Sequence, residues 1–169
     1  MRIKVPIWLG LTFAVTTATT FTTAQSTPPR CTVEDWRRFE QQYASAQDAF
    51  QRGDAEPIKA LWSHADDVTL FGALGGHERG WADIGSRLSQ VARLNTSGAH
   101  KGDDVLTTIV GADLALMVRI EHIPNSGAGA GVGAVTHLRV THAARCESSS
   151  WRIVNRHADP LVENQVPKR

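Results

Sequence analysis

The segment 150–159 carries the side chains best suited to acid–base chemistry. Its alternation of apolar and polar types predicts a β-strand, whose successive side chains point to opposite faces. One face is then predicted to carry Trp151, Ile153, Asn155, His157 and Asp159. A histidine titrates near neutral pH, and a nearby carboxylate could orient it. We therefore predict His157 as acid or base, Asp159 as its orienting partner and Asn155 as a hydrogen-bond donor. The alternative is a structural polar pair, with Asp159 fixing the turn before Pro160.

Two further histidines lie on strands predicted over 113–123 and 132–144. Alternation places His122 and His142 on the same face as the apolar residues of their own strands. Together with His157 they would permit a metal site, because imidazole is a common zinc ligand. The alternative is a set of polar residues at the edge of the sheet. The sequence has no His-Glu-x-x-His or Cys-x-x-Cys spacing. We therefore predict no metal and no cofactor, and interpret His122 and His142 as substrate-binding residues.

Large aromatic side chains fall in elements that are expected to line a pocket: Phe39, Tyr43, Trp62, Phe71 and Trp81. Aromatic rings offer a large apolar surface, and tyrosine and tryptophan add a polar group. The functional interpretation is a binding site for a planar or lipophilic molecule, with Tyr43 as a reserve hydrogen-bond donor. The alternative is an ordinary hydrophobic core, which residues at helical spacing also produce.

The hydrophobic period changes from helical to alternating along the chain. Apolar spacings of three and four predict helices over 33–52 and 81–94, with a shorter helix over 54–62. Thr32 and Asp35 have the spacing of a capping box for the first helix. Strands are predicted over 67–74, 104–110, 113–123, 132–144 and 150–159. Helices followed by strands indicate the α+β class, with a concave pocket between a long helix and a strongly curved sheet.

Length and charge exclude several classes of protein. The chain has 169 residues, which fits one domain of ordinary size. Its 18 basic and 17 acidic residues give a net charge of +1. This balance argues against a nucleic-acid-binding protein that works by bulk positive charge. A small, partly apolar molecule or another protein remains as the expected partner.

Residues 1–24 have the pattern of a signal peptide. Two basic residues precede an apolar stretch over 5–15, and small residues lead to a cleavage site near Ala24-Gln25. The apolar stretch is shorter than the ~20 residues that cross a bilayer. We therefore predict a secreted or periplasmic protein, without stable membrane insertion after cleavage. The alternative is an uncleaved membrane anchor.

The chain has two cysteines, Cys31 and Cys146. Export would place them where thiols can oxidise. A disulfide between them would close a loop from residue 31 to residue 146, which the loop-entropy model values at about 4–5 kcal/mol. The alternative is two unpaired, buried small residues, because the sequence does not show that the cysteines come within reach.

Several short segments of the sequence resemble those of a known superfamily. In the stretch 50–72, one helix ends at Gly53-Asp54, and the next ends near Ala65-Asp66-Asp67 before a strand. Gly80-Trp81 then opens a third helix, and 151–159 resembles a closing strand. This arrangement resembles the nuclear transport factor 2-like superfamily. More narrowly, it is similar to the SnoaL-like and ketosteroid-isomerase-like small domains.

The resemblance covers residues 33–162 and leaves 25–32 as a flexible lead-in and 163–169 as a tail. It implies a cone-shaped domain with three N-terminal helices packed on a strongly curved, mostly antiparallel sheet. It also implies a homodimer formed through the outer face of the sheet. Proteins with this fold include isomerases, dehydratases and cyclases as well as non-catalytic binding and assembly modules, so the fold does not decide the activity.

Two positions depart from the steroid isomerases. Gly72 stands where those enzymes have the aspartate that shuttles the proton, and Ala46 stands where their tyrosine donates to the oxyanion. Tyr43 lies one helical turn earlier. A general base must lie within hydrogen-bond reach of the proton that it removes, and glycine offers none. Isomerisation of steroids by that mechanism is therefore not expected.

These observations predict an exported small-molecule-binding domain. If it is an enzyme, we expect cofactor-free isomerisation, dehydration or cyclisation by acid–base chemistry in the pocket. The alternative is a non-catalytic ligand-binding or oligomeric assembly module of the same fold. The absence of the isomerase base favours the alternative, and the pair His157 and Asp159 favours the enzyme.

Overall fold

Three helices and six strands make up the computed structural model, which describes residues 30–73, 75–95, 98, 100–124 and 135–162. The helices are α1 (Val33–Gln51), α2 (Glu56–Lys59) and α3 (Trp81–Leu94). The strands are β1 (Thr69–Phe71), β2 (His77–Arg79), β3 (Asp103–Val110), β4 (Leu114–Pro124), β5 (Val135–Glu147) and β6 (Ser150–Pro160). The predicted signal peptide, the tail over 163–169 and most of the lead-in lie outside the described residues, as does the start of the strand predicted over 132–144.

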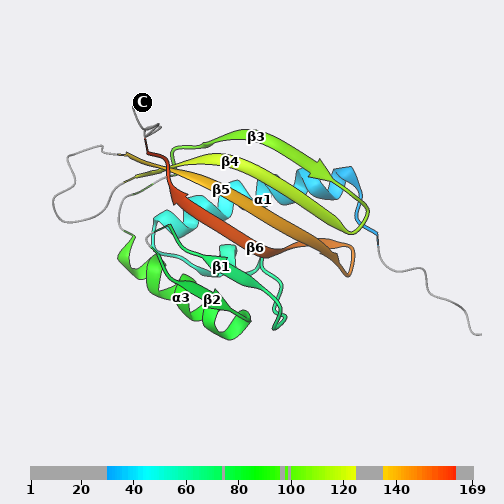
Figure 1. The fold of residues 1–169 in the computed structure, drawn as a ribbon, viewed down its shortest axis with the longest axis horizontal. Helices are drawn as coiled ribbons and strands as arrows, with labels where there is room; N and C mark the ends of the chain where they lie inside the picture. Colours follow the sequence, from blue (N-terminus) through cyan, green and yellow to red (C-terminus); the bar gives the residue numbers. More distant parts are fainter. Residues whose placement is uncertain (1–29, 74, 96–97, 99, 125–134, 163–169) are drawn as a thin grey trace, which may run out of the picture.

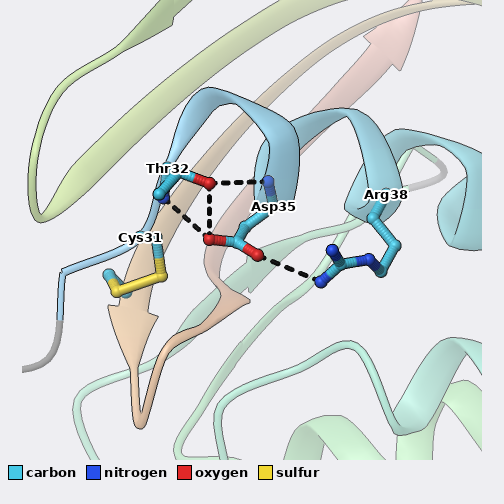
Figure 2. Close-up of a disulfide and its surroundings, with 5 residues drawn as sticks. Cys31, Thr32, Asp35 and Arg38 are labelled. Atoms are coloured by element: carbon cyan, nitrogen blue, oxygen red, sulfur yellow. Dashed lines mark hydrogen bonds and ion pairs between the residues drawn. A yellow bond between two sulfur atoms is a disulfide. The ribbon is translucent and has the colours of Figure 1, made fainter.

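The first helix begins at the predicted capping box. The Asp35 backbone N–H donates to Thr32 Oγ1 at 3.1 Å, and the Thr32 N–H donates to the Asp35 carboxylate at 2.8 Å (Figure 2). These bonds satisfy N–H groups that have no partner within the helix. The Asp35 carboxylate also receives a hydrogen bond from Arg38 at 3.0 Å. The hydrogen bonds from Thr32 lower the pKa of Asp35.

All six strands belong to one curved sheet in the order β2-β1-β6-β5-β4-β3. The β1–β6 pair is parallel and the other pairs are antiparallel. The predicted α+β class and mostly antiparallel sheet are confirmed. The strand predicted over 67–74 forms as the shorter β1, and the strand β2 that follows Gly75-Gly76 was not predicted. The second helix is also shorter than predicted.

Helix α1 lies across one face of the strands β3–β6, and no helix of the described residues covers their other face (Figure 1). Its buried side chains include Trp36, Phe39 and Tyr43. The Trp36 ring meets the edge of Trp151 on β6 at a centroid distance of 5.5 Å. Tyr43 is 1% exposed. The core therefore fills the concave side of the sheet against α1, as the apolar spacing of that helix predicted.

A β-bulge in β6 changes which residues face the core. Ile153 pairs with Ala144 and Asn155 pairs with Ala143, so Val154 is the extra residue. Because side chains alternate along a strand, one extra residue reverses their faces beyond it. Ile153 is buried before the bulge and Ala158 is buried after it, whereas His157 is exposed. The prediction that alternate residues from Trp151 to Asp159 all point to the same face is therefore wrong.

The strand β4 also presents a different face from the predicted one. Its buried residues are Ala115, Met117, Arg119, Glu121 and Pro124. The apolar residues Leu114 and Leu116 lie on the outer face, where they are 60% and 36% exposed. The prediction assumed that the more apolar face is buried. In this strand the buried face carries two charged side chains instead.

A disulfide joins Cys31, directly before α1, to Cys146 near the end of β5 (Figure 2). The two Cα atoms are 5.7 Å apart, within the usual range for a disulfide. This confirms the pairing that the sequence left open. Within the described residues, no helix is both long and apolar enough to cross a membrane.

Candidate functional site

A cavity of about 660 Å³ lies inside the cone, between the helices and the concave face of the sheet. Its size falls in the range of small-molecule sites. Apolar side chains from helices and strands form most of its walls: Phe50, Ile58, Trp62, Leu70, Leu88, Val91, Leu94, Ile123, Leu138 and Ile153. Its polar and charged lining includes Tyr43, Gln47, Arg87, Glu121, His142 and Arg156.

Five hydrogen-bonded polar side chains that line the cavity form what we call the polar floor: Tyr43, Gln47, Glu121, His142 and Arg156. Tyr43 lies at its centre. Its hydroxyl donates to Glu121 Oε1 at 2.7 Å and accepts from Gln47 Nε2 at 2.8 Å. The hydroxyl oxygen also lies 3.3 Å from His142 Nε2. Gln47 follows Tyr43 by one helical turn on the same face of α1, so these two side chains meet directly. The floor therefore joins α1 to the neighbouring strands β4 and β5.

Arg156 completes the floor from β6. Its Nη2 lies 2.6 Å from Glu121 Oε2, and the Glu121 side chain is completely buried. The bulge at Val154 brings Arg156 to this face, since without it Arg156 would point outward. A buried carboxylate needs a partner of opposite charge, and Arg156 supplies it.

Burial and nearby charges shift the ionisation of the polar floor. Burial, with the adjacent Glu121 charge, raises the pKa of Tyr43 well above its ordinary value. Burial, with the charges of Arg156 and Arg119, holds the pKa of His142 well below its ordinary value. Tyr43 therefore stays protonated and His142 stays neutral at neutral pH.

The hydrogen bonds also select one tautomer of His142. The single proton of the Tyr43 hydroxyl goes to Glu121, so the His142 contact with that oxygen requires a donating Nε2–H. Nδ1 of His142 is then an acceptor, and it is buried without a hydrogen-bond partner among the described residues. This tautomer of His142 follows from the hydrogen-bond partners of the ring.

A second charged cluster lies behind Tyr43. The Arg119 guanidinium stacks 4.6 Å from the centroid of the Tyr43 ring and pairs with Asp103 on β3. Asp103 Oδ1 lies 2.6 Å from His100 Nε2. Although burial opposes it, the bond from His100 and the charge of Arg119 lower the pKa of Asp103. These groups do not line the cavity. They pack behind the ring of Tyr43 and hold it in position within the polar floor.

The predicted acid–base pair does not line the cavity. His157 is exposed and its ring lies 5.4 Å from the ring of Phe71. Asp159 forms two hydrogen bonds with Arg139, at 2.9 and 2.6 Å. Asn155 donates to Thr69 Oγ1 at 2.8 Å. The prediction that all three share the concave face is wrong, because the bulge reverses the faces between Ile153 and these residues.

The remaining predicted site residues divide into two groups. Tyr43, Trp62 and His142 line the cavity, as predicted. Three others lie elsewhere: Phe71 is 43% exposed, Trp81 stacks on His64 at 3.9 Å, and His122 lies on the outer face beside His137. The three histidines of the metal hypothesis do not meet. Among the described residues, no group of three or more His, Cys, Asp or Glu side chains could hold a metal ion.

Sequence reasoning missed the charged members of the polar floor. Glu121 was assigned to the face opposite the apolar stripe of its strand, and that stripe is the outer face. The inward position of Arg156 could not be predicted without knowledge of the bulge in β6. Gln47 gave a signal, since it follows Tyr43 by four residues on a helix whose apolar face is buried.

Gly72 lines the cavity wall, and Ala46 is buried in the core. A Cβ added at Gly72 would lie 3.1 Å from the Gly75 carbonyl oxygen and 4.0 Å from Arg87 Nη2. The wall here therefore presents an arginine and no carboxylate.

A family model described as the SnoaL-like domain matches residues 40–163. This chain belongs to the SnoaL-like domain family. The match includes all the strands and every residue of the polar floor. The match confirms the narrower resemblance, to SnoaL-like domains, that the sequence indicated. A comparison with curated proteins gave no match.

Solved structures of NTF2-like proteins share the fold of this SnoaL-like domain. A protein from Thiobacillus denitrificans, provisionally assigned as a calcium/calmodulin-dependent protein kinase type II association domain, is 21% identical. Its TM-score is 0.60 over 80% of this chain and 100% of that chain. A provisionally assigned dehydratase of the NTF2-like family from Streptomyces avermitilis is 17% identical, with a TM-score of 0.58 over 77% and 98%.

A provisionally assigned ketosteroid isomerase from Parabacteroides distasonis is also similar in structure. It is 14% identical, with a TM-score of 0.54 over 76% of this chain and 86% of that chain. Identities this low support the shared fold and do not transfer an activity.

Proposed function

We propose that this SnoaL-like domain binds a small, partly apolar molecule in its cavity. The observation that carries the proposal is the composition of that cavity, which has apolar walls and one polar end, formed by the polar floor. Ligand sites commonly combine a mostly apolar lining with a few placed polar groups. The walls would bury the apolar body, while the floor would orient the polar end of the molecule.

The hydrogen bonds of the polar floor favour binding over catalysis. Both oxygens of Glu121 already accept hydrogen bonds, from Tyr43 and from Arg156. The Glu121 side chain is completely buried, so a substrate proton would have to reach it through the Tyr43 hydroxyl. The ion pair thus supports a role for Glu121 in positioning Arg156.

A cofactor-free acid–base enzyme is the second candidate. The contact between Tyr43 and Glu121 at 2.7 Å, with His142 beside it, favours this alternative. These three side chains could transfer a proton to or from a substrate if Arg156 released Glu121. Isomerisation, dehydration and cyclisation are the reactions of this type that we consider for the cavity.

We propose further that the protein is exported and that a signal peptide is cleaved near Ala24-Gln25. The basic start, the apolar stretch and the small residues of the first 24 positions support this localisation. The disulfide Cys31–Cys146 supports it independently, because such bonds persist mainly in oxidising compartments.

We also propose that the outer face of the sheet forms a homodimer. Ile109 on β3 pairs with Leu116 on β4, and both point outward with Leu114. Half-buried Val118 and Ile120 extend this apolar patch along β4. Contiguous exposed apolar surface commonly marks a protein–protein interface.

A thermal-shift screen tests the binding function. The purified protein is screened with steroids, phenolics, terpenoids and hydroxy acids, beside the variants Val91→Trp and Ala82→Trp. Val91 lines the cavity, whereas Ala82 is an exposed residue of the same helix. A ligand at 100 times its Kd adds about 2.7 kcal/mol of stability. We expect hits on the wild type and on Ala82→Trp that disappear in Val91→Trp. Equal hits on all three proteins would contradict a ligand in this cavity.

Turnover of the hits separates the two candidate functions. Each hit is incubated with the wild type and with Glu121→Gln, and the products are analysed by mass spectrometry or by chiral chromatography. Conversion that depends on Glu121 would establish the acid–base enzyme. Stable binding without conversion would leave the non-catalytic binding function.

A further inference from the structure

We infer that the molecule bound in the cavity is an acid: an apolar body that ends in a carboxylate, held by the guanidinium of Arg156. This inference rests on the binding function proposed above. It adds the chemical class of the ligand and the residue that recognises it.

The charges that a molecule inside the cavity can reach are positive. Among the residues that the structure describes, three fully charged side chains line the cavity: Arg87, Glu121 and Arg156. The Glu121 side chain is 0% exposed, whereas those of Arg156 and Arg87 are 17% and 34% exposed. Tyr43 and His142 add no charge at neutral pH, because of the pKa shifts described above. A carboxylate in the cavity would therefore meet cations, and a ligand amine would meet none of the carboxylate oxygens directly.

The guanidinium of Arg156 has donors available for a ligand. Its ion pair with Glu121 uses Nη2. Nε and Nη1 form no hydrogen bond within the described part of the chain, and neither atom is among the buried polar atoms that lack a partner. A guanidinium offers its N–H groups in a planar fork that matches the two oxygens of a carboxylate. Glu121 accepts from Nη2 and holds the guanidinium in place, while the N–H groups of Nε and Nη1 remain to donate to an oxygen of the ligand.

Arg87 reinforces the positive charge from the wall of the cavity. Its Nη2 lies close to Gly72, where any larger residue would project toward it. Its Nε lies 3.6 Å from Glu78, a longer separation than a hydrogen bond. Glu78 does not line the cavity. Glu78 therefore offsets part of the Arg87 charge through this ion pair, while the terminal nitrogens of Arg87 can donate to a second oxygen of the acid.

The walls define the other end of the ligand. Leu70, Leu88, Val91, Ile123 and Leu138 belong to the apolar walls of the same cavity. Burial of an aliphatic or aromatic body against them is favourable by about 25 cal/mol per Å² of apolar surface. A fully polar anion, such as inorganic phosphate, would leave these walls unused. The site thus fits an amphiphilic acid.

A matched ligand series tests the inference by titration calorimetry at neutral pH. The probes are decanoate, decanamide and decylamine, which share an alkyl chain and differ in the charge of the head group. We expect the wild type to bind decanoate at least about tenfold more tightly than decanamide, because the charge-assisted hydrogen bonds are lost with the amide. Decylamine is expected to bind more weakly still.

Two variants isolate the contribution of Arg156. Arg156→Met alone would leave the buried Glu121 carboxylate without its partner of opposite charge, so the test uses the double variant Arg156→Met/Glu121→Gln. Its control is Glu121→Gln, which keeps the arginine. We expect the control to retain its preference for decanoate over decanamide and the double variant to lose it. Circular dichroism and thermal unfolding verify that both variants are folded.

Each other outcome overturns the inference in a distinct way. Equal affinity of the wild type for decanoate and decanamide would remove the acid class but leave the binding function intact. Tighter binding of decylamine would assign recognition to Glu121 instead of Arg156. A preference for decanoate that persists in the double variant would exclude Arg156 as the recognising residue. Failure of all three probes would overturn the amphiphilic acid as ligand, and the screen with Val91→Trp would then decide the binding function separately.

Discussion

The Tyr43 hydroxyl links three elements of the protein at a single atom. It donates to Glu121, accepts from Gln47 and lies next to His142, and all four residues are at most 4% exposed. Inside a protein, such groups depend on one another, because water cannot replace a missing partner. The polar floor is therefore a structural unit as well as the recognition end of the cavity.

Removal of that hydroxyl is expected to destabilise the fold. In Tyr43→Phe, the Gln47 amide and one oxygen of Glu121 each lose a buried partner. We predict a loss of about 1–3 kcal/mol in the free energy of unfolding, measured by urea denaturation. Thr107→Val, which removes an exposed hydroxyl from β3, serves as the control and should change stability by less than about 0.5 kcal/mol. Equal stability of Tyr43→Phe and wild type would show that the floor is hydrated.

The lowered pKa of His142 predicts a dependence of stability on pH. Burial and the charges of two arginines keep the folded-state imidazole neutral. The unfolded imidazole takes up a proton as the pH falls below about 6.5. The unfolded state then binds more protons, so stability decreases with falling pH until the folded-state pKa is reached.

His142→Gln removes this titration and keeps a hydrogen-bond donor. Between about pH 6.5 and about pH 5, we expect the wild type to lose up to ~1.4 kcal/mol per pH unit more than the variant. Urea denaturation at several pH values measures the two slopes. His100, whose pKa is raised by Asp103 against the effect of burial, has the opposite dependence but is present in both proteins. Parallel slopes would mean that His142 is solvated in the folded state.

At the scale of residues, the sequence predicted the apolar part of the site better than its charged part. Tyr43 and Trp62 followed from helical spacing, because apolar periodicity reflects burial directly. Arg156 could not be found, since one unpaired residue at position 154 decides which face it takes. Glu121 was placed outside for a related reason, as its strand buries charges and exposes leucines.

At the scale of elements, the turn between β5 and β6 carries a strained backbone. Ser148 and Ser149 have φ values of 47° and 61°, in the left-handed region that disfavours residues with a Cβ. Two-residue hairpins with two positive φ values usually contain Asn-Gly or Gly-Gly. Serine at these positions therefore stores free energy that glycine would release.

Ser149→Gly is expected to raise the free energy of unfolding by about 0.5–1 kcal/mol. The matched control is Ser150→Gly, which makes the same chemical change one residue later, inside β6. That control should lower stability, because glycine in an extended strand costs entropy without relief of strain. Thermal and urea denaturation of the two variants measure the difference. Destabilisation by Ser149→Gly would contradict the left-handed conformation of this turn.

The long helices could be predicted because their hydrophobic periodicity and their capping residues indicate the same bounds. α3 spans the predicted residues, and α1 begins at the predicted capping box. The short elements β1, β2 and α2 were mispredicted. Their few residues are too short a window to show a hydrophobic periodicity. The pairing of β1 with β6, which the sequence does not show, determines where β1 lies.

At the scale of the whole molecule, the disulfide fixes the start of α1 to the far end of the sheet. Cys31 and Cys146 are separated by 115 residues, so the bond closes most of the described chain. We predict that Cys31→Ala/Cys146→Ala loses up to about 4–5 kcal/mol in the free energy of unfolding, chiefly through the unfolded state. Urea denaturation of the variant, and of the wild type under reducing conditions, should agree. A loss below about 1 kcal/mol would mean that the capping box and the aromatic core hold this end without the bond.

The last prediction concerns the outer face of the sheet, because the homodimer proposed above would bury its exposed apolar patch. Ile109 and Leu114 are 61% and 60% exposed, and Leu116, which pairs with Ile109 and follows Leu114 by two residues, is 36% exposed. Burial of this patch against a second copy would place like residues together around a two-fold axis, which is the common arrangement of homodimers. A charge at its centre would remain unpaired in such an interface, so Leu116→Glu should convert a dimeric wild type to a monomer. Val33→Glu, at an apolar position that is 57% exposed at the start of α1, should remain dimeric. Sedimentation velocity distinguishes these states, and a monomeric wild type or a dimeric Leu116→Glu would exclude this face as the interface.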